Sequence, residues 1–251
     1  MSERPPADLG TTIAGVRLPF VAMNASGVSS TTAAELRALA RSETGAIVLR
    51  TATLHPLVHP AYRSLQNPGA AAYLPLVREL ADAGTRPVIP SIAGATVDEY
   101  AILARTFADA GAALIEANVA DEWVAATLAP FEDARTLGAL AARLASDCPV
   151  PVSLKFPPRF AASYRKLGPV LADAGIGVIV IQNDFAGFEK FLLESGGRFE
   201  MIVFGGIRSG YDVRRALGKG AKAVQVGSAL AAEGPGLFAR LAREMRMARS
   251  S

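Results

Sequence analysis

Short apolar runs recur along the whole chain, and a stretch with helical periodicity follows each of them. The runs are rich in β-branched residues and are continuously apolar rather than alternating, which is typical of parallel strands covered on both faces. Eight runs can be recognised, at residues 18–26, 46–53, 87–94, 112–119, 150–157, 177–184, 201–207 and 223–230. Their starts lie 22 to 41 residues apart, which leaves room for a crossover helix in every interval.

The stretches between the runs carry helix-end signals. Stretches such as "TVDEYAILARTFADAG" and "SGYDVRRALGKG" begin at Thr or Ser and end at Gly, the residues that helix caps prefer. Eight parallel strands alternating with helices predict an α/β protein with the (β/α)₈ TIM-barrel fold, which leaves no sheet edge exposed. With 251 residues, 51% of them hydrophobic, we expect a single domain over residues 1–251. The segment "TTIAGVRLP" before the first run predicts a small hairpin that plugs the bottom of the barrel.

Charge and composition narrow the possible partners. The net charge of +3 is only mildly basic, and the cationic residues are scattered except near the C-terminus, so we expect no nucleic-acid partner. No apolar run approaches the roughly 20 residues needed to span a bilayer, and the start of the sequence lacks an apolar signal core. The single cysteine, Cys148, excludes an intrachain disulfide and fits a reducing compartment. These features predict a cytoplasmic protein without a membrane partner.

Paired glycine turns follow the last two predicted strands, at Gly205–Gly206 and at Gly227–Ser228. In a barrel, turns at this position expose backbone N–H groups, and the following helix adds a partial positive charge. Glycine lets anion oxygens approach these amides and tolerates a positive φ. The pattern predicts a phosphate-binding site. The alternative is that the glycines only relieve crowding at the corners of the barrel.

Polar residues end most of the other predicted strands and would line the same mouth. They are Asn24, Ser26, Arg50, Thr51, Ser91, Glu116, Asn118, Lys155, Gln182, Asn183 and Asp184. A pocket rich in amides and poor in acids suits a planar, hydrogen-bonding ligand better than a metal. Lys155 lies in an otherwise apolar strand, where an unpaired ammonium group is costly. It is therefore expected to face an anionic or electron-rich group, or to pair with Glu116 inside the barrel.

Several motifs resemble the soluble, class 1-like dihydroorotate dehydrogenases, which are FMN-dependent barrels. They are "MNASG" (23–27), "RTAT" (50–53), "SIAG" (91–94), "EAN" (116–118), "LKFPP" (154–158) and, most specifically, "GGIRSGYDVRRALGKGAKAVQVGSALAAEGPGLFARL" (205–241). The resemblance runs in order through nearly all of the chain. It implies the fold, an FMN cofactor, an oxidoreductase activity on CH–CH donors and a possible homodimer.

The resemblance also assigns roles to individual residues. It implies that Lys155 lies near the N1 and O2 edge of the flavin and stabilises the reduced ring. The other implied FMN contacts are Gly205, Gly206, Gly227 and Ser228 at the phosphate, and Ala25, Ser26, Thr51 and Asn118 at the ring. The expected substrate contacts are Asn24, Arg50, Asn118, Gln182 and Asn183.

Two departures from the family bear on catalysis. Arg50 replaces a lysine; it cannot serve as a titrating base but can bind a carboxylate through two hydrogen bonds. The loop that carries a catalytic Cys or Ser in the family reads "VADEW" here, which puts Asp121 in the cysteine's place. Cys148 precedes the fifth predicted strand and would lie at the opposite end of the barrel. Asp121 is therefore expected either to be the catalytic base, with Lys155 as the second catalytic residue, or to cap a helix.

These observations predict an FMN-dependent oxidoreductase that transfers a hydride between a substrate carbon and flavin N5. The remodelled positions predict an anionic small-molecule substrate other than dihydroorotate. Two alternatives remain, a phosphate-binding barrel isomerase or synthase and a catalytically silent flavin-binding paralogue. The two histidines, His55 and His59, are expected to have surface or packing roles rather than to bind a metal.

Overall fold

A computed structural model describes residues 8–27, 29–58, 66–119, 134–156, 164–182 and 185–247. Its main feature is a curled parallel sheet of seven strands in the order β3-β11-β10-β9-β8-β7-β6. The strands are β3 (Ala22–Asn24), β6 (Ser91–Ile92), β7 (Ile115–Asn118), β8 (Val152–Lys155), β9 (Val178–Gln182), β10 (Glu200–Phe204) and β11 (Ala223–Val226). Neighbouring strands along the chain are mostly neighbours in the sheet, as in a barrel.

A separate parallel pair, β4 (Ile47–Val48) and β5 (Val88–Ile89), completes the ring. β5 and β6 share one predicted run, in which Pro90 separates them, and a bridge from Ala52 to Ile92 links the pair to the large sheet. Each of the eight predicted runs thus contains strand, and the predicted α/β barrel is confirmed. The predicted runs are longer than the strands; residues 228–230 of the last run, for example, begin α9.

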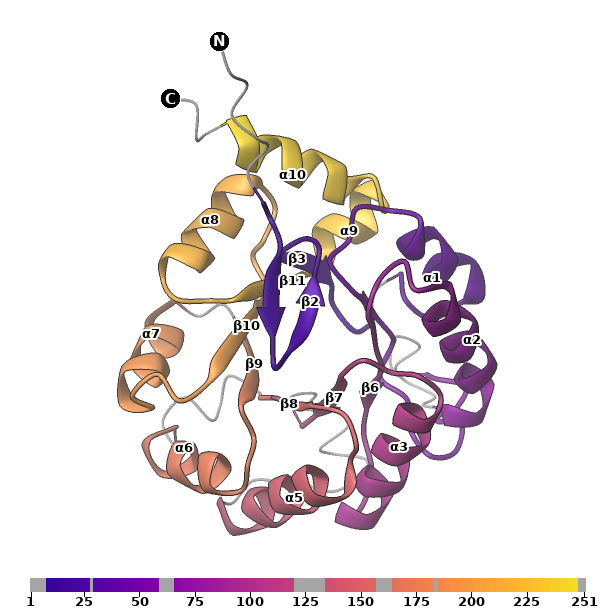
Figure 1. Cartoon of the computed structure of the whole chain (residues 1–251), viewed down its shortest axis with the longest axis vertical. Coiled ribbons are helices and arrows are strands. Elements are labelled where there is room, and N and C mark those ends of the chain that lie inside the picture. Colours follow the sequence, from indigo (N-terminus) through magenta and orange to yellow (C-terminus); the bar gives the residue numbers. More distant parts are fainter. Residues whose placement is uncertain are drawn as a thin grey trace.

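Helices surround the strands in sequence order, as Figure 1 shows. They are α1 (Ala33–Ala40), α2 (Ala70–Ala83), α3 (Val97–Asp109), α5 (Ala134–Asp147), α6 (Tyr164–Asp173), α7 (Phe185–Glu194), α8 (Gly210–Gly218), α9 (Ser228–Glu233) and α10 (Leu237–Met247). Side chains cap the first turns: Thr32 and Glu35 form a capping box on α1, and Ser209 and Asp212 form one on α8. Such boxes satisfy backbone N–H groups that a helix leaves free at its start.

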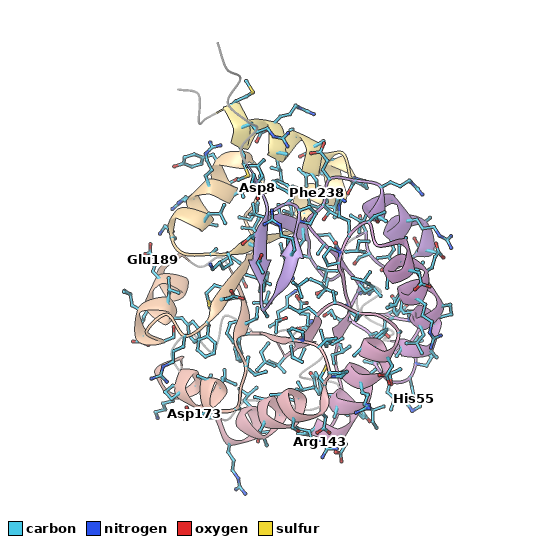
Figure 2. The ribbon with its side chains drawn as sticks, in the orientation of Figure 1. Asp8, His55, Arg143, Asp173, Glu189 and Phe238 are labelled. Atoms are coloured by element: carbon cyan, nitrogen blue, oxygen red, sulfur yellow. The ribbon has the colours of Figure 1, made fainter. Side chains whose placement is uncertain are left out.

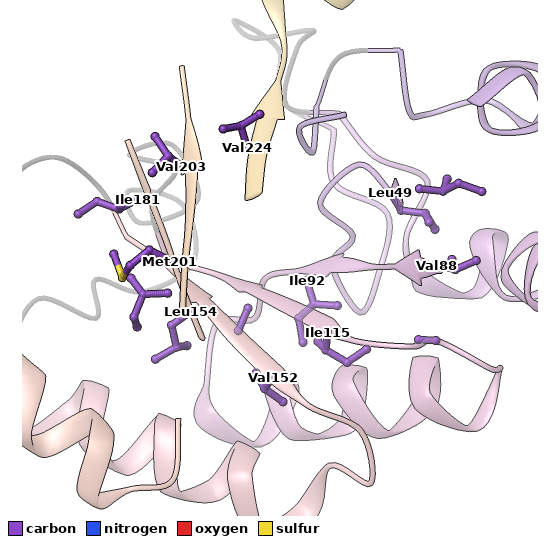
Figure 3. Packing of buried hydrophobic residues seen from close by; sticks show 14 of the residues in the cluster. Leu49, Val88, Ile92, Ile115, Val152, Leu154, Ile181, Met201, Val203 and Val224 are labelled. Atoms are coloured by element: carbon purple, nitrogen blue, oxygen red, sulfur yellow. The ribbon is translucent and has the colours of Figure 1, made fainter. Parts of the chain in front are cut away.

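The buried residues form two layers, one on each side of the strands. Outward-facing residues such as Ile115, Leu154 and Val203 pack under the helices (Figure 3). Inward-facing residues such as Val180 and Ile202 form a second cluster inside the barrel. Because successive side chains of a strand point to opposite faces, every second residue of a barrel strand enters the interior.

An antiparallel hairpin of β1 (Thr11–Ile13) and β2 (Val16–Leu18) crosses one end of the barrel (Figure 1). Ile13 and Leu18 are each 1% exposed and belong to the interior cluster. The hairpin tip is held by Ala14, whose N–H donates to Glu200 at the start of β10. The predicted plug is therefore confirmed, and the carboxyl ends of the strands form the other end of the barrel.

The seam between β3 and β4 is closed mainly by a side chain. The Asn24 amide accepts from Val48 N at 2.9 Å and donates to Val48 O at 2.6 Å, and Gly45 N donates to Ala22 O at 2.8 Å. A Cβ on Gly45 would lie 1.8 Å from Phe20 O. Only glycine lets the two segments approach this closely.

The outer surface of the helices carries charged side chains, including Arg143, Asp173 and Glu189 (Figure 2). Within the described ranges, no helix combines the length and the apolar character needed to cross a bilayer.

Candidate functional site at the barrel mouth

Lys155 lies inside the barrel near its mouth and is only 6% exposed. Its Nζ donates to Ser26 Oγ at 2.9 Å and to Glu116 Oε1 and Gln225 Oε1 at 3.2 Å each. Gln225 Nε2 donates to the other carboxylate oxygen of Glu116, which closes a ring of three side chains. The Phe204 ring centroid lies 4.8 Å from Nζ, within reach of a cation–π interaction. The pairing with Glu116, which was the alternative to contact with an anionic or electron-rich group, is present, and the bond to Ser26 extends the network to the mouth.

The strand register explains how these side chains meet. Glu116 and Asn118 on β7 pair with Ser153 and Lys155 on β8, and alternation turns all four into the barrel. Gln225 on β11 follows the same phase and is 1% exposed. Gln225 was not among the predicted site residues, although it is the one polar residue in the buried strand "AVQV".

A second polar cluster joins Thr51, Ser91 and Asn118. Thr51 Oγ1 lies 3.0 Å from Ser91 Oγ, and Asn118 Nδ2 donates to Thr51 Oγ1 at 2.9 Å. Tyr100 OH donates to Asn118 O at 2.8 Å, and burial raises the pKa of Tyr100, so this phenol keeps its proton. The structure thus brings together Thr51 and Asn118, two predicted FMN contacts, while Tyr100 was not anticipated.

The two glycine turns are neighbours because β10 and β11 are adjacent in the sheet. Gly205 and Gly206 have φ of +90° and +69°, a region that favours glycine. Gly227 precedes α9, and Ser228 is its first, exposed residue. The amides of Gly205, Gly206 and Ser228 have no acceptor among the described residues. Free amides on adjacent turns fit a phosphate group.

The start of α8 does not add to this set of donors. The N–H groups of Arg208 and Ser209 both donate to Asp212, and Gly210 N donates to Glu244. Gln182, the exposed last residue of β9, lies beside the turn, since a Cβ on Gly205 would be 3.6 Å from its Cγ. This places a predicted substrate contact next to the predicted phosphate site.

Arg50 connects two loops at the mouth and is 9% exposed. Its Nε donates to Gln66 O at 2.9 Å, its Nη1 donates to Gly27 O, and its backbone N donates to Ser30 O. Two nitrogens of the guanidinium group thus donate hydrogen bonds to main-chain carbonyls. Its contact with a substrate carboxylate stays a prediction.

Asn24 is fully buried, and its amide bonds to Val48 across the barrel seam. The structure gives it a structural role, and its predicted contact with a substrate stays a prediction without support from this geometry. Ala25 and Ser26 follow β3 and are partly exposed. Ala25 lies against the glycine turns, because a Cβ on Gly227 would be 3.8 Å from Ala25 Cβ.

Four of the residues singled out in the sequence, Asp121, Asn183, Asp184 and His59, lie outside the described residues. His55 is exposed at the edge of the molecule (Figure 2). In the described part of the chain, no three His, Cys, Asp or Glu side chains gather as metal ligands would. Cys148 lies between α5 and β8, at the amino end of that strand as predicted, and burial raises the pKa of its thiol.

These features define a class: a parallel α/β barrel with a hairpin at one end and an anion-compatible, amide-rich site at the other. No protein-family model matches the chain. The dihydroorotate dehydrogenase (fumarate) of Trypanosoma cruzi is 28% identical over 278 residues, covering 90% of this chain and 88% of that protein. The protein of the same name from Trypanosoma brucei brucei is 26% identical over 279 residues, covering 91% and 88%.

A solved structure agrees at the level of the fold. The crystal structure of DHODH from Eimeria tenella in complex with ferulenol matches with a TM-score of 0.82 and 14% identity, covering 98% of this chain and 85% of that one. The chain is thus similar in sequence to curated dihydroorotate dehydrogenases over about nine-tenths of its length, and it shares its fold with the Eimeria tenella structure.

Proposed function

We propose that this protein is an FMN-dependent oxidoreductase of the dihydroorotate dehydrogenase type. The observation that carries the proposal is the buried Lys155 network beside a pair of glycine turns with free amides. The relatives' name supports the same class of reaction. When bound, FMN would supply the hydride acceptor at N5; the chain itself contributes binding, orientation and charge.

The residues present fit this cofactor by their donor chemistry. The backbone N–H groups at Gly205, Gly206 and Ser228 would bind the phosphate, and Gly227 leaves room for it. At the other end, Thr51 and Asn118 would offer hydrogen bonds to the ring, with Ala25 and Ser26 against it. Lys155 would favour the reduced, anionic ring, since a positive charge beside developing negative charge lowers its energy.

The proposed substrate is a small anion, because the mouth has more buried cations than anions. The buried charged side chains among the described residues are Arg50, Lys155 and Glu116. Gln182 and Asn183, with any donor that Arg50 can spare, would orient the substrate. Asp121 would accept its proton, provided that burial brings the carboxylate into the working range; the alternative is that Asp121 caps a helix.

The absorption spectrum of the purified protein tests FMN binding. We expect a yellow protein and expect Gly227→Val to lose the flavin, because the added methyl groups occupy the phosphate approach. Gly227 is the sharper choice, since its φ of −111° is negative, whereas Gly205 and Gly206 have positive φ values that favour glycine. Gly177→Val is the matched control; Gly177 lies in open space before β9, at the far end of the barrel. A colourless wild type would instead favour an isomerase or synthase.

Anaerobic mixing tests the substrate. Because the relatives are named for dihydroorotate and fumarate, this pair is the first to try. We expect weak or no reduction by dihydroorotate, owing to the changes at Arg50 and Asp121. Rapid bleaching of the flavin band would contradict this expectation.

The next experiment is a screen of small carboxylates with an oxidisable CH–CH bond, in which reduction of the flavin is measured. With an active substrate, Asp121→Asn should slow flavin reduction by about 10²-fold or more if Asp121 is the base. An unchanged rate would indicate a helix cap. A yellow protein that no donor reduces would favour the silent flavin-binding paralogue.

A further inference from the structure

Arg240, in α10, binds the segments that follow both glycine turns. Its Nε and Nη2 donate to the two carboxylate oxygens of Glu233, the last residue of α9, at 2.9 and 2.8 Å. The same Nη2 donates to the carbonyl oxygen of Arg208, two residues after Gly206, at 3.0 Å. α9 begins at Ser228, and α10 packs on both α8 and α9 (Figure 1). One side chain therefore joins the segment after β10 to the helix after β11.

Glu244 holds the same arginine from one turn further along α10. Its Oε1 accepts from Arg240 Nη1 at 2.6 Å, and its Oε2 accepts from Gly210 N at 2.6 Å. A Cβ on Gly210 would lie 2.7 Å from Glu244 Cβ, so the start of α8 contacts α10 directly. We call Arg240, Glu233 and Glu244 the α10 clamp. The clamp fixes the far end of the segment that begins at Gly205, while β10 fixes its near end.

The clamp also fixes the orientation of α9. This helix has six residues, with Ser228 at one end and Glu233 at the other, so it is about 9 Å long. Its first turn is closed by Ala231 N, which donates to Gly227 O at 3.0 Å. A short helix that is held at its last residue moves as a unit. The bond to Glu233 therefore sets the direction of the backbone N–H at Ser228.

The clamp is better suited to fix geometry than to stabilise the fold. The side chains of Arg240 and Glu233 are 30% and 42% exposed, and ion pairs this exposed contribute little to the free energy of unfolding. All three nitrogens of the Arg240 guanidinium group donate hydrogen bonds, however. A planar group bound in this way defines distances and angles that the single ammonium group of a lysine cannot reproduce.

We propose that Arg240 is a positioning residue for the two glycine turns: it sets how their backbone N–H groups converge on a phosphate group that it does not itself contact. The inference rests on the proposed FMN function, in which these turns bind the phosphate of the cofactor. Preorganised donors bind more tightly, because the cost of ordering them is met on folding rather than on binding. Loosening the clamp should therefore weaken only the phosphate part of flavin binding.

Riboflavin, which lacks the phosphate, separates the two parts of flavin binding. Protein stripped of flavin is titrated with FMN or with riboflavin, and the quenching of flavin fluorescence gives each affinity. We expect Arg240→Gln to bind FMN about tenfold more weakly and to bind riboflavin as wild type does. Arg240→Lys keeps the charge but lacks the planar fork, and should lose FMN affinity to a similar extent. Full FMN affinity in Arg240→Lys, or an equal loss for both flavins in Arg240→Gln, would overturn the proposal.

Arg37→Gln is the matched control. Arg37 forms a bidentate pair with Glu79 between α1 and α2, at 2.7 and 2.6 Å, and neither helix follows a glycine turn of the phosphate site. The variant should leave both affinities unchanged. A loss of FMN affinity as large as that of Arg240→Gln would overturn the proposal, because any exposed ion pair would then have the same effect.

Glu233→Ala separates positioning from charge by the sign of its effect. Removing a carboxylate at the far end of α9 would tighten FMN binding if charge alone mattered, because it reduces the repulsion of the phosphate. The proposal instead expects FMN to bind several-fold more weakly, because α9 is released from Arg240. In the Arg240→Gln background, Glu233→Ala should add little, since coupled residues are not additive. Unchanged or tighter FMN binding in Glu233→Ala, or full additivity, would overturn the proposal.

Flavin binding by the wild type separates the two levels of failure. A wild-type protein that binds neither FMN nor riboflavin overturns the proposed function and this inference with it. A protein that binds FMN with an affinity insensitive to Arg240 and Glu233 overturns this inference alone.

Discussion

Tyr73 and Tyr100 are two buried phenols with opposite surroundings. Tyr100 OH donates to Asn118 O, whereas Tyr73 OH is buried and has no hydrogen-bond partner among the described residues. Burial raises the pKa of Tyr73 to about 12, so both phenols stay neutral at ordinary pH. A neutral hydroxyl also loses its hydrogen bonds to water when it is buried. Tyr100 replaces them with its bond to Asn118 O.

The two Tyr→Phe variants should therefore differ in sign. Tyr73→Phe should leave the free energy of unfolding unchanged or raise it by up to about 1 kcal/mol, since an unpaired buried hydroxyl is removed. Tyr100→Phe should lower it by about 1–3 kcal/mol, because Asn118 O loses its donor. Urea unfolding followed by circular dichroism measures both. Equal losses would mean that the Tyr73 hydroxyl has a partner in solution.

For single residues, the chemical type of a side chain predicted where it lies in the barrel better than it predicted what the side chain binds. Lys155 was identified because one cation stood in an apolar strand, and its place in the barrel follows from alternation. Asn24 and Arg50 were also expected at the mouth, yet Asn24 bonds to Val48 and Arg50 to Gln66 O and Gly27 O. Those partners come from other segments, whose approach the sequence pattern does not reveal.

Among the elements, the β3–β4 seam depends on Gly45. We expect Gly45→Ala to lower the free energy of unfolding by at least about 3 kcal/mol, because its Cβ would overlap the Phe20 carbonyl oxygen and push the two segments apart. Gly218→Ala in α8 is the control; its Cβ meets nothing within 4 Å, so stability should hold or rise slightly. Thermal unfolding of both variants measures the change in stability. A Gly45→Ala variant as stable as wild type would show that the seam can open without loss of stability.

The elements themselves were largely predictable, because apolar runs and helix caps are local signals. The plug hairpin also followed from its short apolar stretch before the first run. What the pattern missed was the division of residues 87–94 into β5 and β6, which Pro90 separates. Proline cannot donate to a ladder, but its effect on pairing depends on the neighbouring strands.

In the whole molecule, the order of the strands in the barrel brings segments that are far apart in the sequence together at the site. The two glycine turns are predictable neighbours, because consecutive parallel strands of a barrel lie side by side. Among the described residues, the assembled barrel buries two cations, Arg50 and Lys155, and one anion, Glu116, which is the basis of the proposal that the ligand is an anion.

Glu244 links α10 to α8, the helix that follows the Gly205–Gly206 turn. Its carboxylate accepts from Gly210 N and from Arg240 Nη1, each at 2.6 Å. Burial alone would raise the pKa of Glu244, but these donors and the nearby arginines outweigh burial and hold the pKa below its usual 4.5. A carboxyl group whose pKa is lowered by folding stabilises the protein above its unfolded pKa, and this contribution is lost as the pH falls.

We therefore expect Glu244→Gln to lower the urea midpoint at pH 7 and to have a shrinking effect as the pH falls below about 4.5. Protonation removes the charge of wild-type Glu244 as the pH falls through its lowered pKa, so the two proteins should converge towards acid pH. Glu43→Gln removes an exposed carboxylate elsewhere and should change the midpoint little at either pH. A Glu244→Gln deficit that persists undiminished at acid pH would show that the side chain stabilises the α8–α10 contact by packing rather than by charge.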